Sequence, residues 1–187
     1  MVSLPLAIPP VAIGFFLLFL LGRHGPVGAL VHRLLGMDIV FTWVAAAFAA
    51  AIVSFPLMAR TIMVAMGEVD PRLELAARSL GAGPWRVALT ITLPLAYRGI
   101  LAGVLLGFVR AVSEFGATIT VAGNIAGRTQ TLPLAIYERV QLRDDSAALQ
   151  LILVSVALAV VTLLIHDWLI RRSKRLTLHA STPSKYR

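Results

Sequence analysis

The chain contains no cysteine, and only 14% of its 187 residues are charged. The absence of cysteine excludes disulfide bonds and thiolate metal sites. The scarcity of charge, together with 58% hydrophobic residues and a mean hydropathy of +0.86, argues against an ordinary soluble domain, in which roughly 45 to 50% of residues are apolar. The composition therefore predicts a membrane protein.

Three uncharged apolar runs are long enough to cross a bilayer as helices, namely residues 2–21, 39–59 and 147–165. A further crossing is expected near residues 94–112. The runs lack strict alternation of apolar and polar residues, which favours helices over an outer-membrane barrel. We therefore predict an all-α polytopic membrane protein with about four or five transmembrane helices. A single transmembrane domain is expected over residues 1–170, followed by a short basic tail over residues 171–187.

The first apolar run is interrupted by Pro5, Pro9 and Pro10, and no basic segment of the kind that begins a signal peptide precedes it. Proline removes backbone donors, so such a helix is better placed inside a bundle than at the head of an inserting chain. We therefore expect that a segment upstream of this run is missing from the sequence.

The net charge of +8 comes from basic residues that flank the apolar runs. No basic stripe with interleaved aromatic residues is present, which argues against a nucleic-acid partner. The positive-inside rule places both basic segments in the cytoplasm, and two crossings between them are consistent with this placement. The residues are Arg60, Arg72, Arg78, Arg86 and Arg98 around the first loop, and Arg171, Arg172, Lys174, Arg175, Lys185 and Arg187 in the tail.

The segment 70–92 predicts two short helices around a glycine hinge. Asp70 and Pro71 are typical of a helix start, Gly81 is a helix stop, and Pro84 restarts a second helix. Pro94 is expected to open the next span. The alternative is an amphipathic element that lies on the lipid surface.

The crossing near residues 94–112 carries glycines every four residues, at 99, 103 and 107, which predicts close packing of this helix against protein. Arg110 and Glu114 have the i, i+4 spacing of an ion pair. Either a structural pair or a role in a substrate path fits the spacing. The following residues 115–127 are too few for a span and predict a broken or re-entrant segment that lines a cavity. Residues 128–146 are expected to be an interfacial or external connection.

The pattern A-A-x3-G-x9-I-x-L-P, which ends at Pro94, resembles the EAA motif of the membrane subunits of bacterial ABC importers. The family has Glu directly before the two alanines, whereas this chain has Leu75 there and Glu74 one position earlier. The resemblance implies that residues 70–92 are coupling helices that dock into a groove on a separate ATPase subunit. The implied coupling residues are Glu74, Ala76, Ala77, Gly81, Ile91, Leu93 and Pro94.

The segments LPLAIPP, SFPLMARTI and SEFGATITVAGNIAGRTQTLPLAIY are similar to the molybdate branch of this family, and the sulfate permeases are the alternative. The resemblance implies a permease of the inner membrane that carries molybdate or tungstate and is not itself an enzyme. Its implied partners are a second copy of the chain, two ATP-binding cassette subunits that bind ATP and Mg, a periplasmic or lipid-anchored binding protein, and lipid. No cofactor is implied in this chain. Molybdate permeases usually carry one more helix before the proline-rich run, so that helix is expected to be missing.

An oxyanion path is expected to offer charged groups and hydrogen-bond donors. The candidate residues are Arg110, Ser113, Glu114, Thr118, Thr120 and Asn124. The rival of another class, an ion-coupled secondary transporter, would be expected to show an internal repeat or ionisable groups on several helices. A membrane enzyme is disfavoured, because no G-x4-G-K-[ST] loop, nucleophile and base pair or metal-binding cluster can be assembled from the sequence.

Overall fold

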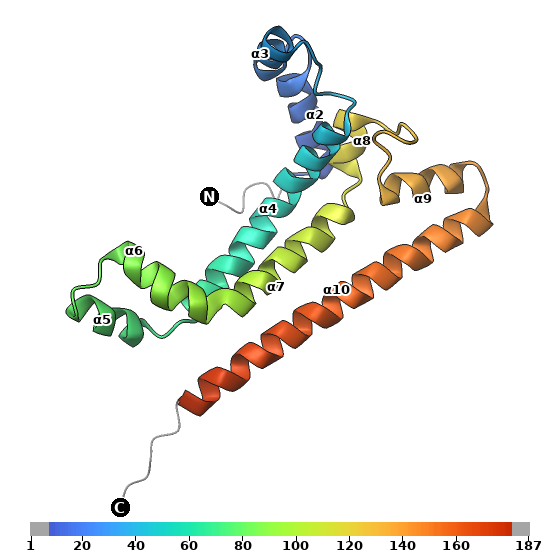
Figure 1. Ribbon diagram of the computed structural model, residues 1–187. Coiled ribbons are helices and arrows are strands. Elements are labelled where there is room, and N and C mark those ends of the chain that lie inside the picture. The colour runs from blue at the N-terminus through green and yellow to red at the C-terminus, as the bar shows by residue number, and fades with distance from the viewer. Residues whose placement is uncertain (1–7, 181–187) are drawn as a thin grey trace, which may run out of the picture. The chain divides into compact units, whose positions relative to one another are not determined.

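The computed structural model describes residues 8–180 of the chain, with side chains placed up to residue 170. Every regular element among these residues is a helix (Figure 1), which confirms the predicted all-α class. The elements are α2 (Pro10–Leu21), α3 (Pro26–Leu35), α4 (Trp43–Gly67), α5 (Pro71–Ser79), α6 (Pro84–Val87), the π-helical turn η1 (Ala88–Thr92), α7 (Leu93–Val112), α8 (Gly116–Ala122), α9 (Leu132–Gln141) and α10 (Asp145–Ala180).

Three segments of the described chain are long and apolar enough to cross a membrane: Trp43–Gly67, Pro84–Val112 and Asp145–Ile170. Helices α2 and α3 together count as a fourth if the 48° bend between them is part of one broken span. Of the predicted run 2–21, the described residues from Pro10 onward form α2. Pro10 begins α2 instead of breaking it, because the first helical position needs no N–H donor. The tail residues Lys185 and Arg187, like residues 1–7, lie outside the described part.

The second span differs from the predicted run 39–59 at both ends. Helix α4 begins at Trp43, because Phe41 takes a left-handed backbone conformation (φ 60°) and donates its N–H to the carbonyl of Val121. Thr42 then accepts a hydrogen bond from the N–H of Ala45, as an N-terminal cap does. The helix continues past Arg60 to Gly67. Apolar length alone therefore placed this helix about one turn too early.

The predicted start of the next span at Pro94 is wrong. Helix α6 continues through the π turn η1 into α7 without a break, so that Pro84–Val112 is one apolar segment. Pro94 removes one intrahelical hydrogen bond, and the π turn directly precedes it. The second short helix of segment 70–92 is consequently the beginning of the span.

The described chain divides into two compact units. The first contains residues up to Leu57 together with Gly107–Val160, and its core is formed by α2, α8 and the outer part of α4. Helices α2 and α8 lie side by side (Figure 1) and pack closely because Gly14 faces the backbone of Ala117: a Cβ atom added at Gly14 would lie 2.7 Å from the Ala117 Cα. Small residues thus set the distance between these two helices.

The second unit contains Met58–Leu106 and the residues from Val161 onward. Within it, Gly99 and Gly103 of α7 lie against α4: a Cβ at Gly99 would collide with Ala65, and one at Gly103 would lie 2.8 Å from the Ile62 side chain. These two contacts confirm that the glycine face of this crossing packs against protein.

Candidate functional site

The inner hairpin, defined here as α5, the turn at residues 80–83 and the second arm formed by α6 and η1, is built by local sequence chemistry. Asp70 accepts a hydrogen bond from the N–H of Arg72 (2.9 Å) and Pro71 occupies the first turn of α5. At the other end Gly81 has φ +84°, with its N–H on the carbonyl of Arg78 and the next N–H, of Ala82, on the carbonyl of Ala77. This is the Schellman motif that ends many helices, and it confirms the predicted hinge.

One side-chain hydrogen bond joins the two arms of the inner hairpin. The Thr92 hydroxyl, in η1, donates to a carboxylate oxygen of Glu74 in α5 at 2.7 Å. Thr92 is buried and Glu74 is half-buried. The carboxylate that the sequence suggested for coupling therefore lies between the arms, where it fixes their spacing.

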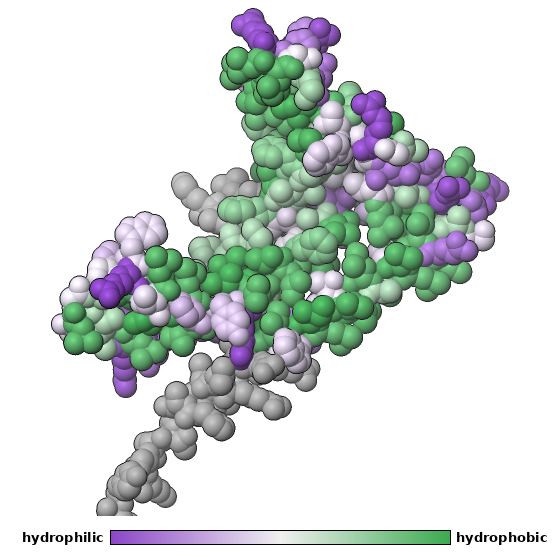
Figure 2. Space-filling model, in the orientation of Figure 1, coloured by the Kyte–Doolittle hydropathy of each residue, from purple (hydrophilic) through white to green (hydrophobic). Residues whose placement is uncertain are grey.

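The solvent-exposed surface of the inner hairpin carries large apolar side chains beside charged ones (Figure 2). Leu80 is 90% exposed and Trp85 is 82% exposed, on either side of the Gly81 turn. Monomeric proteins rarely expose such side chains in a contiguous patch unless they bind a partner or a membrane. Of the other predicted coupling residues, Ala76, Leu93 and Pro94 are exposed, while Ala77 and Ile91 are half-buried.

Arg110 and Glu114 form the ion pair that their spacing predicted. The guanidinium lies 2.7 Å from a carboxylate oxygen of Glu114, whose side chain is 2% exposed. The other carboxylate oxygen accepts the N–H of Ala117 in the first turn of α8 (2.9 Å). Glu114 thus satisfies a free helix-end donor and neutralises Arg110, which gives it a structural task.

The predicted hydroxyl donors turn toward their own backbone. The hydroxyl of Ser113 donates to the Arg110 carbonyl (3.1 Å), that of Thr118 to the Phe115 carbonyl (2.9 Å), and that of Thr120 to the Gly116 carbonyl (2.8 Å). Hydroxyls on helices commonly make such bonds. With the protons used in this way, these three groups offer oxygen acceptors and no free donors.

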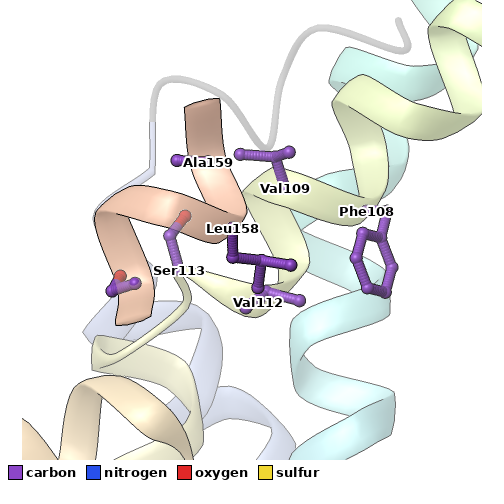
Figure 3. Close-up of a pocket in the computed structure, with 7 residues that line it drawn as sticks. Phe108, Val109, Val112, Ser113, Leu158 and Ala159 are labelled. Carbon is purple, nitrogen blue, oxygen red and sulfur yellow. The ribbon is translucent and has the colours of Figure 1, made fainter. Parts of the chain in front are cut away.

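Ser113 also lines a small hollow beside Val112 and Leu158 (Figure 3). The hollow measures about 40 Å³ and is lined mainly by apolar side chains.

Residues 123–131, which we call the outer loop, connect α8 to α9. The N–H groups of Arg128, Thr129 and Gln130 all lie within 3.2 Å of the Ile125 carbonyl oxygen. The Thr129 hydroxyl accepts the Ile125 N–H in return (3.0 Å). The loop begins at Gly123 (φ +70°), the residue that ends α8.

Side chains attach the outer loop to α9. A Glu138 carboxylate oxygen accepts hydrogen bonds from the amide of Asn124 (2.9 Å) and from the amide of Gln130. Sequence reasoning proposed Asn124 as a substrate donor and missed Glu138. The structure places the Asn124 amide on Glu138, where it supports the loop.

A larger hollow lies beside the outer loop and has a volume of about 330 Å³. It opens between the first turns of α4, the end of α7 and the start of α9. Sequence reasoning placed Thr118 on a possible path, and Thr118 lines this hollow, but the segment 128–131 was taken only as a connection. The lining residues are Trp43, Ala46, Ala47, Ala50, Ala111, Val112, Thr118, Arg128, Thr129, Gln130, Thr131 and Leu132.

With three or four helices long and apolar enough to cross a membrane, the described residues have the architecture of a polytopic membrane protein. The chain belongs to the family of binding-protein-dependent transport system inner membrane components, and residues 1–175 match this family. It is therefore a multi-pass protein of the inner membrane.

Individual relatives define the branch. The chain is 49% identical over 172 residues to the molybdenum transport system permease protein ModB of Escherichia coli K12, an alignment that covers 91% of this chain and 75% of the relative. It is 44% identical over 175 residues to ModB of Haemophilus influenzae, covering 93% and 76% of the two chains. The sulfate transport system permease protein CysW of Synechocystis is 36% identical over 171 residues, covering 91% and 62%.

Proposed function

We propose that this chain is the membrane subunit of an ABC importer that carries molybdate across the inner membrane. The observation that carries the proposal is the inner hairpin, a capped and hinged pair of helices with exposed Leu80 and Trp85 at its turn. Membership of the transport family and the similarity to the two molybdenum permeases support it.

In this proposal two copies of the chain assemble with two ATP-binding cassette subunits, which bind ATP and Mg and hydrolyse the nucleotide. A periplasmic or lipid-anchored binding protein delivers the anion to the outer face. Leu80 and Trp85 insert into a groove on the ATPase subunit, as an amphipathic helix does in helix-in-groove recognition. Ala76 and Gly81 contribute to the contact by being small.

Continuity of the helix gives the inner hairpin its mechanical effect. Helix α6 passes through η1 into α7 without a loop, so a force on Trp85 is transmitted along the span Pro84–Val112. The Thr92–Glu74 hydrogen bond makes α5 follow the same movement. ATP binding in the partner thereby moves a membrane helix and changes the side to which the anion path opens.

Sulfate is the second candidate substrate, because the sulfate permease CysW is also similar over 91% of the chain. Molybdate, tungstate and sulfate are all tetrahedral dianions, so one path can accommodate each of them. The captured anion then depends on the binding protein.

The test is co-purification of the tagged chain with its ATPase subunit in mild detergent, followed by ATPase assays with binding protein loaded with molybdate, tungstate or sulfate. We expect a stable complex whose ATP hydrolysis is stimulated by the molybdate-loaded protein. Stimulation by sulfate alone would reassign the substrate. Failure to form any complex, also when an upstream helix is added, would overturn the proposal in favour of an ion-coupled transporter.

A pair of glycine variants separates coupling from folding. Gly81→Val places a β-branched residue at φ +84° and should abolish the complex, because the turn can no longer form without strain. Gly83→Val is the matched control: Gly83 has φ −68°, and neither glycine has another atom within 4 Å of its added Cβ. Equal loss in both variants would show that the left-handed turn is not what the ATPase subunit requires.

A further inference from the structure

An exposed arginine, Arg128, lines the hollow beside the outer loop. In the part of the chain that the structure describes, no carboxylate forms an ion pair with its guanidinium. The other arginine that lines a possible path, Arg110, is neutralised by Glu114. No Asp or Glu is among the described residues that line the hollow. Its local charge is therefore positive.

Thr131, the N-cap residue of α9, also lines the hollow. Its hydroxyl oxygen is buried, does not cap the helix and has no hydrogen-bond partner among the described residues. Buried polar groups are nearly always paired, so a ligand in the hollow would give this hydroxyl a partner once the side chain turns toward it.

The start of α9 adds a third favourable contribution. Thr131 and Leu132, the residues at its N-terminus, both line the hollow. The N-terminus of a helix carries partial positive charge, and this one has ten residues. The neighbouring carboxylate, Glu138, is occupied by the amides of Asn124 and Gln130, so it does not oppose an anion as a free acceptor would.

The two sides of the membrane are assigned by charge. The basic residues around α5 and α6 place the inner hairpin in the cytoplasm, and one span, Pro84–Val112, separates it from the outer loop. The hollow therefore lies toward the outer face. Its volume of about 330 Å³ is enough for an anion that keeps part of its hydration shell, at roughly 30 Å³ per water.

We propose that the hollow formed by Arg128, Thr131 and the start of α9 is an outer binding site for the transported tetrahedral oxyanion. The inference rests on the proposed import function and adds a location to it. Arg128 attracts the dianion, the Thr131 side chain turns toward the hollow so that its hydroxyl donates to one of the anion's oxygens, and the alanine side chains of α4 form an apolar wall that strengthens both interactions. The hydrogen-bonded outer loop holds the backbone of Arg128 in place before the anion arrives.

The experiment uses proteoliposomes that contain the chain, its ATPase subunit and externally added molybdate-loaded binding protein. Two quantities are measured for each variant: uptake of radioactive molybdate and ATP hydrolysis. In Arg128→Gln we expect uptake to fall at least tenfold, while binding-protein-stimulated ATP hydrolysis stays within twofold of wild type. Arg128→Lys keeps the charge and should retain more uptake than Arg128→Gln. Thr131→Val should lower uptake about threefold.

Arg143→Gln is the matched control. Arg143 is exposed, lies on the same outer side between α9 and α10, and does not line the hollow. It should leave both quantities unchanged. If Arg128→Gln does not assemble, uptake by the Thr131→Val variant tests the proposed site on its own.

Three results would overturn the inference. Unchanged uptake in Arg128→Gln and Thr131→Val would show that the hollow holds no anion. Joint loss of ATP stimulation and uptake in Arg128→Gln would show that Arg128 contacts the binding protein instead. An equal loss of uptake in Arg143→Gln would show that the loss in Arg128→Gln comes from the general surface charge. Absence of stimulation and uptake in the wild type would instead contradict the proposed import function, which keeps the two failures distinct.

Discussion

The inner hairpin and the outer loop both turn the chain between helices at glycines with positive φ, yet they are built in opposite ways. The inner hairpin has one side-chain hydrogen bond between its arms, Thr92 to Glu74, and exposes Leu80 and Trp85. In the outer loop, three N–H groups meet at the Ile125 carbonyl and two amides meet at Glu138. The first construction presents a surface to a large partner, whereas the second holds a few polar groups in fixed positions for a small one.

This comparison predicts that variants of the first compact unit, which contains the outer loop, lose stability, and that variants on the exposed surface of the inner hairpin lose binding. Glu114→Ala should have the largest effect, because it leaves Arg110 without its partner and the Ala117 N–H without an acceptor. We expect the free energy of unfolding to fall by about 3 kcal/mol, at the lower end of the range for buried pairs because Arg110 is 31% exposed. Thermal unfolding in detergent measures it. Glu68→Ala, at an exposed carboxylate, is the control; equal losses would contradict the structural role of Glu114.

Trp85→Ala should leave the isolated chain as stable as wild type and weaken its complex with the ATPase subunit. Exposed aromatic anchors often contribute about 2 kcal/mol to binding, which corresponds to a roughly 30-fold rise in Kd. A binding titration in detergent checks it. Phe48→Ala removes an exposed aromatic ring from α4 and should not alter Kd. If Trp85→Ala destabilised the chain as much as Glu114→Ala, the contrast between the two regions would fail.

Gly14→Ala should loosen α2 from α8, because the added Cβ would lie 2.7 Å from the Ala117 Cα and 2.8 Å from its carbonyl oxygen. Backbone atoms cannot move aside as a flexible side chain can, and we expect a loss of about 1.5 kcal/mol. The unfolding midpoint in detergent is the measurement. Gly67→Ala is the control, since no atom lies within 4 Å of its added Cβ. A stabilised Gly14→Ala protein would refute the close packing.

Thr92→Val should free α5 from η1 at a cost of about 1 kcal/mol, because it removes the donor to Glu74. Faster hydrogen exchange of the α5 amides is the expected sign, without a change in the exchange of α8. Thr90→Val serves as comparison, since the Thr90 hydroxyl donates to the Arg86 carbonyl within its own helix. Identical exchange in both variants would mean that the bond to Glu74 does not hold the arms together.

The smallest expected effect concerns Asp144, at the corner between α9 and α10. Hydrogen bonds from the Ala147 N–H and the Ser146 hydroxyl, aided by Arg139, hold the pKa of this carboxyl below its ordinary value. Its stabilising contribution is therefore present above the unfolded pKa of about 3.9 and is lost as the pH falls through the lower folded pKa.

Asp144→Asn should slightly lower the unfolding midpoint at pH values above that window and flatten its dependence on pH within it. Melting curves between neutral and strongly acidic pH provide the measurement. Asp145→Asn removes the neighbouring carboxylate without touching the donors to Asp144, and it should retain the wild-type profile. A parallel change in both variants would assign the effect to the net charge of the corner.

Local chemistry explains which parts could be predicted from the sequence. Asp70, Pro71 and Gly81 define helix ends through their own backbone preferences. Arg110, in the last turn of α7, meets Glu114 because the chain keeps turning just beyond the helix, where the Glu114 N–H donates to the Ala111 carbonyl. The bond from Thr92 to Glu74 joins residues 18 positions apart, so only the folded hairpin brings them together. The coupling and substrate roles given to these residues stay predictions.

The contacts around the outer loop could not be predicted from the sequence, because they depend on tertiary structure. Glu138 belongs to α9, and nothing in its sequence surroundings indicates that Asn124 and Gln130 will converge on it. Arg128 lines a hollow that is also formed by α4. Its sequence position, in a segment predicted to be only a connection, did not indicate this role. The hydroxyls of Ser113 and Thr118 were read as donors from polarity, whereas their backbone acceptors became evident only with the helical turns in place.

The shape of the outer loop is held by the carbonyl of Ile125, which belongs to the main chain and is present whatever the side chain. Substitutions at Ile125 and Ala126, which are both exposed, therefore leave this scaffold in place. Only a few positions, such as Gly123 with its positive φ and Thr129 with its hydroxyl, are restricted in residue type. Such a loop can exchange the side chain at position 128 during evolution while the shape of its main chain stays the same.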